Sequence, residues 1–361
     1  MKILIIGNGS IGVEKNSNKF YIPKNTGDFL KKINEGAEVH YMDLSSNYAK
    51  NNNLLDFDLG ANNIICSVFK NKKNPFSYIK LLLLLLKMDY VYLFYPGTFS
   101  RLVALMAYIW NKPFGLYVRG KYYNQDRLDK FLLKRARFIL TISPSFVSDL
   151  IFFCRNTEII SPMIDVNLDD LNKNREIYKP KIWNFLFVGR VEERKGIHEL
   201  IDVAKNLKKH KINFVLNIVG GGDLFDEISA SLVDTNLSKE IVLHGLISDK
   251  QELKNMYNTA DCFVFTSHDE GFPRVLYEAM ASALPIFTTF VGGVAGLMKN
   301  LDNCIEIPVK NADKASEIIL KYIGEEDILR TVSLNGLSTI KKIIESDLLS
   351  HDVLLLKYLK K

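Results

Sequence analysis

The chain has 361 residues, of which 47% are hydrophobic and 24% charged, and its formal net charge is +6 at pH 7. This length is too great for one ordinary hydrophobic core and predicts two domains, while the composition is normal for a globular protein. The longest purely apolar runs fall well below the roughly 18 residues that span a bilayer, so we expect a soluble chain without a transmembrane helix.

Apolar, strand-like runs alternate with helix-like segments along the whole chain. The runs are residues 2–6, 38–42, 64–69, 90–94, 114–118, 138–141 and 158–160 in the first half, and 185–188, 214–219, 241–243, 262–265, 286–288 and 304–307 in the second. Such alternation predicts parallel sheets with helices on both faces. The predicted fold is therefore α/β, with two doubly wound, Rossmann-like domains that face each other across a cleft and bind ligands at the C-terminal ends of the strands.

The first predicted strand leads into Gly7-Asn8-Gly9-Ser10-Ile11-Gly12, a literal G-x-G-x-x-G sequence. Taken alone, this pattern indicates a dinucleotide-binding loop. Against that, residues 13–19 are polar rather than an apolar helix, and the acid expected about 20 positions later is missing, with Asp43 the nearest candidate. Two further interpretations stay open. Gly9 and Ser10 could let an acceptor or a diphosphate approach the backbone, or the loop could be a purely structural tight turn.

Charge is divided unevenly between the two halves of the chain. Residues 1–180 hold 25 Lys and Arg against 16 Asp and Glu, whereas residues 181–361 hold 22 against 25. A basic first half indicates an anionic partner, either a membrane surface or a phosphate-rich acceptor, and no nucleic acid is expected. Within it, residues 80–87 contain six consecutive leucines between two lysines. This run favours a buried helix, with a membrane-facing helix as the alternative.

The change of domain is expected within residues 165–183, a polar stretch rich in Asp, Asn and Lys. We therefore assign residues 1–170 to an N-terminal domain and residues 181–346 to a C-terminal domain.

Cysteine usage and the N-terminus indicate a cytoplasmic protein. The four cysteines, Cys66, Cys154, Cys262 and Cys304, are scattered without metal-ligand spacing. Buried free thiols are favoured over disulfides. The chain begins directly with a strand-like run, without the pattern of a signal peptide.

Arg190 and Lys195 follow the predicted strand 185–188, and Lys195-Gly196 opens the next helix. A planar guanidinium and a flexible ammonium can together hold a diphosphate, and they would stabilise negative charge that grows on a leaving group. The alternative for each is a solvated surface charge.

Residues 220–222, three glycines that include Gly221, follow the next strand, where they serve either close packing or close approach of a nucleotide.

Residues 270–281, Glu-Gly-Phe-Pro-Arg-Val-Leu-Tyr-Glu-Ala-Met-Ala, place two carboxylates eight positions apart. Run 262–265 predicts a buried strand before them, and Pro273 suits the first turn of a helix. The free N–H groups and the dipole of that turn favour an anion. Glu270 is then expected at the end of the strand, and Glu278 about two turns into the helix, near the same face.

This E-x7-E pattern resembles the nucleotide-sugar site of the retaining GT-B glycosyltransferases of family 4. Matching pieces occur in the family's order across residues 183–293, while the first half of the chain matches in architecture only. The pieces are Phe187-Val188-Gly189-Arg190-Val191, Lys195-Gly196, Ile218-Val219-Gly220-Gly221-Gly222, His244-Gly245, Leu284-Pro285 and Val291-Gly292-Gly293.

The resemblance implies roles for individual residues. Glu270 would contact the transferred sugar beside Arg190 and Lys195, and Glu278 would bind the ribose hydroxyls. A last helix, about 347–361, would pack back on the first domain. The remaining donor-binding positions are Gly221, Gly245, Leu246, Gly271, Phe272 and Arg274.

The resemblance further implies an enzyme of hexosyltransferase type. It would transfer a sugar with retention from a UDP- or GDP-sugar to a saccharide or lipid-linked saccharide acceptor, in surface polysaccharide biosynthesis. Neither a metal nor a cofactor is expected, and an association with the inner face of the cell membrane stays open. The alternatives are a catalytically silent nucleotide-sugar-binding protein, an NAD(P)-dependent enzyme that uses the loop at Gly7, and a glycoside hydrolase with two carboxylates.

One departure from the resembling family concerns the first domain. Some relatives carry a histidine in the cleft, but His40 is the sole histidine in the first half of this chain. Arg119, at the end of a strand-like run, is predicted instead to face the cleft and to help hold the acceptor or the phosphates. Residues 56–58 form a D-x-D sequence typical of metal sites in another glycosyltransferase fold, but they do not follow a buried strand, so we expect no metal there.

Overall fold

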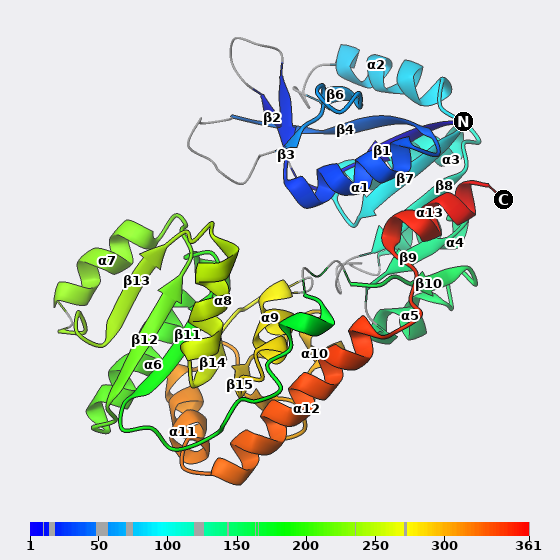
Figure 1. Ribbon diagram of the computed structural model, residues 1–361. Coiled ribbons are helices and arrows are strands. Elements are labelled where there is room, and N and C mark those ends of the chain that lie inside the picture. Colours follow the sequence, from blue (N-terminus) through cyan, green and yellow to red (C-terminus); the bar gives the residue numbers. More distant parts are fainter. Residues whose placement is uncertain are drawn as a thin grey trace. The chain divides into compact units, whose positions relative to one another are not determined.

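The structure is a computed structural model that describes residues 1–9, 11–13, 19–47, 57–69, 75–118, 126–142, 144–162, 164, 166–234, 236–270 and 273–360. Its contacts divide the chain into two compact units (Figure 1). Unit 1 is Met1–Pro162 with Asp347–Lys361, and unit 2 is Met163–Ser346.

Unit 1 is built on a mainly parallel sheet with the strand order β10-β9-β8-β7-β1-β4, and β6 also pairs with β4. Each strand predicted in the first half of the chain is present. The bounds are β1 (Lys2–Ile6), β4 (Glu38–Asn47), β6 (Ile65–Phe69), β7 (Tyr90–Tyr95), β8 (Phe114–Val118), β9 (Ile139–Thr141) and β10 (Thr157–Ile159).

Three short strands extend this sheet beyond β4, and the sequence did not predict them. They are β2 (Ile11–Val13), β3 (Phe20–Ile22) and β5 (Phe57–Asp58), and the pairs β2–β3 and β3–β5 are antiparallel. Strands of two or three residues are too short to show a period-two pattern, which explains why they were missed.

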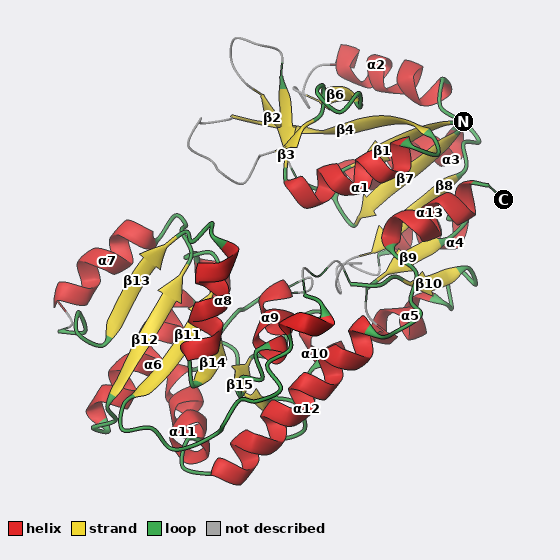
Figure 2. Ribbon diagram, viewed as in Figure 1, coloured by secondary structure: helices red, strands yellow, loops and turns green. Residues whose placement is uncertain are grey.

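The helices of unit 1 cover both faces of its sheet (Figure 2). Alternate side chains of β1 separate the two cores: Leu4 and Ile6 belong to one, and Ile3 and Ile5 belong to the other. The first core includes residues of α2 (Pro75–Leu86), α3 (Thr98–Ile109), α4 (Arg127–Arg135) and α5 (Pro144–Leu150), and the second includes residues of α1 (Lys24–Asn34) and α13 (His351–Leu359).

The C-terminal helix α13 is an integral part of unit 1. Leu354 and Leu355 are buried in its second core, and the Ser161 N–H donates to the Leu349 carbonyl at 2.9 Å. The ring of His351 stacks on Phe29 with the ring centroids 4.2 Å apart. Helix α13 therefore packs on α1 and shares a core with the sheet that α1 covers.

Unit 2 has a wholly parallel six-stranded sheet with the order β13-β12-β11-β14-β15-β16. Its strands are β11 (Trp183–Val188), β12 (Phe214–Val219), β13 (Ile241–Gly245), β14 (Cys262–Phe265), β15 (Ile286–Thr288) and β16 (Ile305–Glu306). Its helices are η1 (Leu168–Asp170), η2 (Glu193–Lys195), α6 (Ile197–Lys209), α7 (Phe225–Asp234), α8 (Lys250–Thr259), α9 (Arg274–Ala281), α10 (Val294–Leu297), α11 (Ala312–Tyr322) and α12 (Glu326–Ile344). Each strand predicted in the second half is present.

The boundary between the units lies at residues 162–163, earlier than the predicted end of the first domain at residue 170. Val166 and Leu171 are buried in the core of unit 2. The guanidinium of Arg175 donates to the carbonyls of Ser282, Ala260, Tyr257 and Asn258 at 2.6, 2.7, 2.8 and 3.0 Å. The segment has the polar composition of a linker, but these contacts make it part of unit 2.

Two predictions from composition can be compared with the structure. All four cysteines are free thiols, and Cys154, Cys262 and Cys304 are buried, as predicted. Among the helices of the described residues, none has both the length and the apolar character needed to cross a bilayer.

Candidate active site

The loop after β14 positions Glu270 through buried hydroxyl groups. Ser267 is fully buried, and its hydroxyl lies 2.8 Å from Glu270 Oε1 and 3.0 Å from the Arg194 carbonyl oxygen. The Thr289 hydroxyl donates to the Ser267 carbonyl at 2.6 Å. Glu270, itself buried, is thereby held at the C-terminal end of β14, as the sequence predicted.

Lys195 forms an ion pair with Glu270. Its ammonium donates to Glu270 Oε1 and lies 5.9 Å from the centroid of the Phe265 ring. The two side chains are only 20% and 9% exposed, so water screens their charges less than it screens a surface pair. The structure therefore brings together two of the three side chains that the sequence selected for catalysis.

Two glycines allow this close approach of separate loops. Gly196 has φ of +66°, and a Cβ there would lie 2.1 Å from the Thr266 carbonyl oxygen. Gly292 has φ of +53°, and a Cβ there would lie 1.7 Å from the Glu270 carbonyl oxygen. Glycine is required at both positions because any side chain would collide with backbone in a conformation that is already unfavourable.

Arg190 lies apart from this pair. Its guanidinium is 3.3 Å from Glu192 Oε2, and its side chain is 54% exposed. Glu192 also approaches Arg194, with a separation of 3.4 Å. The two guanidinium groups are exposed, whereas the Glu192 side chain that they share is only 13% exposed. The sequence did not anticipate Glu192 as the partner of Arg190, because no spacing rule for a loop relates the two side chains.

The three glycines after β12 serve different purposes. A Cβ at Gly220, where φ is +136°, would lie 1.9 Å from the Gly189 carbonyl oxygen, and one at Gly222 would lie 2.3 Å from the Val191 carbonyl oxygen. Both glycines are therefore required for packing. A Cβ at Gly221 would meet nothing within 4 Å, so this position adjoins open space.

The loop that follows β13 is held against these glycines by its backbone. The Gly220 N–H donates to the Gly245 carbonyl at 2.7 Å, and Gly245 has φ of +67°. The Leu246 side chain is exposed. Gly221, Gly245 and Leu246 thus belong to neighbouring strand ends of the same sheet.

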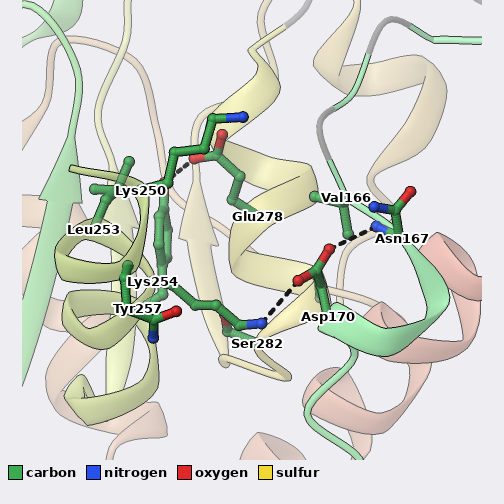
Figure 3. A pocket seen from close by; sticks show the side chains of 11 residues that line it. Val166, Asn167, Asp170, Lys250, Leu253, Lys254, Tyr257, Glu278 and Ser282 are labelled. Carbon is green, nitrogen blue, oxygen red and sulfur yellow. Dashed lines mark hydrogen bonds and ion pairs between the residues drawn. The ribbon is translucent and has the colours of Figure 1, made fainter. Parts of the chain in front are cut away.

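Glu278 lines a pocket of about 280 Å³ formed by α8, α9 and η1, and Glu270 is not among the lining residues in the described part of the chain (Figure 3). The Tyr257 hydroxyl donates to Glu278 Oε2 at 2.7 Å. Burial raises the pKa of this hydroxyl well above its usual value, and the neighbouring carboxylate acts in the same direction, so Tyr257 remains a donor. Figure 3 shows the Lys250 side chain extending alongside the Glu278 carboxylate.

A second ion pair, between Lys254 and Asp170, also lines this pocket. Lys254 Nζ lies 2.8 Å from Asp170 Oδ1, and the Asn167 N–H donates to Asp170 Oδ2 at 2.9 Å (Figure 3). These contacts lower the pKa of Asp170, and the hydrogen bond from Lys254 contributes most to this effect. The pocket therefore presents charged and hydrogen-bonding groups together with apolar side chains such as Val166 and Leu253.

Several predicted site residues lie outside the described residues, namely Ser10, Arg119, Gly271 and Phe272. Arg274 is exposed and begins α9, whose N-cap, Pro273, makes no side-chain capping hydrogen bond.

In unit 1, the glycine loop after β1 is hydrogen-bonded to Asp43, a residue of the neighbouring strand β4. Asp43 Oδ2 accepts hydrogen bonds from the Gly9 N–H and the Tyr41 hydroxyl, both at 3.0 Å. Burial raises the pKa of Asp43, while these hydrogen bonds and one from Leu44 act in the opposite direction. A Cβ at Gly7 would lie 2.1 Å from the Asp43 carboxylate. The acid that the dinucleotide interpretation needs for a ribose is thus engaged with the loop.

Two histidines, one in each unit, lie close to polar groups of other segments. His40 Nε2 lies 2.8 Å from the Ser67 hydroxyl, and burial lowers its pKa. His268, two residues before Glu270, is largely buried, with Nε2 3.0 Å from Glu199 Oε2.

Sequence reasoning missed Ser267 and the role of Tyr257. A serine directly after a buried strand and three residues before Glu270 was the available signal for Ser267. For Tyr257 no local pattern was available, because it reaches Glu278 from a different helix.

The family described as glycosyl transferases group 1 has a model that matches residues 170–358. CapM of Staphylococcus aureus, a capsular polysaccharide biosynthesis glycosyltransferase, is 29% identical over 188 residues, which are 51% of this chain and 49% of that protein. The Escherichia coli UDP-Gal:alpha-D-GlcNAc-diphosphoundecaprenol alpha-1,3-galactosyltransferase is 25% identical over 188 residues, 49% of this chain and 48% of that protein. The chain thus spans about half the length of these curated relatives.

Solved structures extend the similarity to the whole chain. The crystal structure of Anabaena Alr3699/HepE in complex with UDP superposes with a TM-score of 0.66 at 18% identity, covering 100% of this chain and 98% of that one. At this identity the likeness concerns the fold, and it confirms the predicted GT-B fold.

The Gly292 contact predicts a specific sensitivity of unit 2. We expect Gly292→Ala to lower the free energy of unfolding by about 2–4 kcal/mol, because the new Cβ strains the backbone and displaces Glu270. Gly221→Ala, where the Cβ meets open space, should change it by less than about 0.5 kcal/mol. Denaturant unfolding followed by circular dichroism measures both values, and equal losses would contradict the assignment.

Proposed function

Because the chain belongs to the glycosyl transferases group 1 family, we propose that it is a retaining, family 4-type hexosyltransferase. In this proposal, unit 2 binds a UDP- or GDP-sugar, and unit 1 binds a saccharide or lipid-linked saccharide acceptor. The observation that carries the proposal is the partly buried Lys195–Glu270 pair at the end of a parallel strand, in the same unit as the pocket of Glu278.

The cations of unit 2 suit a diphosphate leaving group. Lys195 would donate to the phosphate oxygens, and its position against Phe265 and Glu270 keeps the ammonium in place before the donor binds. Arg190, whose side chain is 54% exposed, would exchange its contact with Glu192 for a phosphate, and Arg194 would remain as a partner of Glu192. Negative charge grows on the leaving phosphate as the glycosidic bond breaks, and fixed cations stabilise it.

The two carboxylates suit the sugar and the ribose. Glu270 would accept hydrogen bonds from hydroxyls of the transferred sugar, and its charge would stabilise the oxocarbenium-like transition state. Glu278, oriented by Tyr257, would accept hydrogen bonds from the ribose hydroxyls, since a carboxylate oxygen can accept more than one hydrogen bond. Gly221, Gly245 and Leu246 would approach the base, and Gly271, Phe272 and Arg274 would lie near the sugar and phosphates.

Unit 1 is proposed to receive the acceptor. Gly9, Ser10 and Arg119 are the residues that we assign to it, and retention follows if the leaving phosphate takes the acceptor's proton on the same face of the sugar. The relatives support a role in surface polysaccharide biosynthesis, because one is named for capsular polysaccharide and another for a diphosphoundecaprenol-linked saccharide. An enzyme with such an acceptor would work at the cytoplasmic face of the membrane.

Removal of the Glu270 carboxylate tests the proposed chemistry. We expect Glu270→Gln to lower the rate of sugar transfer by about 100-fold or more, because an amide cannot stabilise the positive charge of the transition state. Glu227→Gln, on the exposed surface of α7, is the matched control and should retain normal activity. The measurement is transfer from radiolabelled UDP- and GDP-sugars to lipid-linked acceptors, with the anomeric configuration of the product read by NMR. Full activity of Glu270→Gln, or an inverted product, would refute the proposed mechanism.

Metal independence is a separate expectation. Lys195 and Arg190 supply the positive charge at the phosphates, so transfer by the enzyme should be unchanged in the presence of excess EDTA. Loss of activity with EDTA and its recovery with Mn²⁺ or Mg²⁺ would show that the two cations do not suffice.

A further inference from the structure

Helix α2 exposes an apolar stripe on the surface of unit 1. Phe76, Ile79, Leu83 and Leu86 are 69, 52, 55 and 44% exposed. At 3.6 residues per turn, these positions fall within about 80° of one another around the helix axis. The leucine run, which the sequence assigned to a buried helix, is therefore buried on one side only, at Leu81 and Leu85.

Positive charge borders this stripe. Lys80 lies along one side of it by the same helical spacing, and Lys87 follows the last residue of the helix; both are exposed, and α2 itself contains no acidic residue. Long lysine side chains can keep their ammonium groups in a polar layer while their stems cover apolar surface.

Further exposed apolar side chains lie at the end of α3, and the segment that follows α3 contacts the end of α2. Lys112 Nζ donates to the carbonyls of Leu86 and Met88 at 2.8 and 2.7 Å, which joins the last turn of α2 to the segment after α3. Ile109 and Trp110, just before Lys112, are exposed. We call the exposed side chains of Phe76, Ile79, Leu83, Leu86, Ile109 and Trp110 the α2 surface.

We infer that the α2 surface docks on an anionic lipid bilayer, lying in its headgroup layer without crossing it. Apolar side chains with an adjoining tryptophan and bordering lysines suit that layer, where one side is apolar and the other is wet and negatively charged. A second copy of the chain fits less well, because a symmetric contact would bring the like charges of Lys80 and Lys87 together. The inference rests on the lipid-linked acceptor of the proposed function, which such docking would bring to unit 1.

Co-sedimentation of the full chain with vesicles tests this inference. We expect binding to vesicles of phosphatidylcholine with phosphatidylglycerol at low salt, with release at high salt and little binding to phosphatidylcholine alone. Ile79→Ser with Leu83→Ser should lower the partition coefficient about tenfold, and so should Lys80→Glu with Lys87→Glu.

Matched variants locate the contact. Phe152→Ser removes a still more exposed apolar side chain after α5, and Lys130→Glu with Lys134→Glu makes the same charge change on α4. Both should bind vesicles nearly as well as the unaltered chain. Equal losses in these controls, absence of binding to anionic vesicles, or a dimer that the α2 variants dissociate would each overturn the inference.

The nucleotide-binding site supplies an independent readout. The α2 variants should bind UDP or GDP as the unaltered chain does, because α2 and the donor residues belong to different units. If the chain binds vesicles but transfers no sugar, the docking surface is retained and the proposed function is refuted. If it transfers sugar to lipid-linked acceptors without binding vesicles, the proposed function is retained and the docking surface is refuted.

Discussion

The ion pair between Lys195 and Glu270 is the interaction on which the site of unit 2 depends. It joins the loops that follow β11 and β14, which are neighbours in the sheet. Gly196, in the first of these loops, lies directly against the backbone of Thr266 in the second, and Gly292, in the loop after β15, lies against the backbone of Glu270; both glycines have positive φ. The ammonium and the carboxylate are thus positioned by backbone packing before a ligand arrives, which is the condition under which fixed charges stabilise a transition state most effectively.

The two units divide the chemistry between them. Unit 2 holds the ion pair, the pocket of Glu278 and the open position at Gly221, all at the ends of parallel strands or beside them. In unit 1, the glycine loop is hydrogen-bonded to the buried Asp43, and α2 together with the adjoining Lys87 exposes lysines and apolar side chains. A small, highly charged donor and a lipid-linked acceptor would require this kind of difference, because one needs a preorganised polar site and the other needs a bilayer within reach.

The sequence was sufficient for the main strands and for the position of Glu270, because buried parallel strands appear as uninterrupted apolar runs that end where the site begins. It failed for β2, β3 and β5, which are too short to show a pattern, and for the domain boundary, where Arg175 binds four carbonyls within a polar stretch. The partners of charged side chains could not be predicted from the sequence either. Arg190 meets Glu192, and Glu278 meets Tyr257, through rotamers and helix packing that no spacing in the chain encodes.

The proposed function requires unit 2 to bind a nucleoside diphosphate through its cations and carboxylates. The most direct test is the thermal stability of the unaltered chain and of Glu278→Gln in the presence of UDP, GDP, NAD⁺ and NADPH. Our account predicts a midpoint that rises with the concentration of one nucleoside diphosphate, by mass action, and a smaller rise for the variant. A rise with nicotinamide nucleotides alone would contradict it and would assign nucleotide binding to the loop at Gly7.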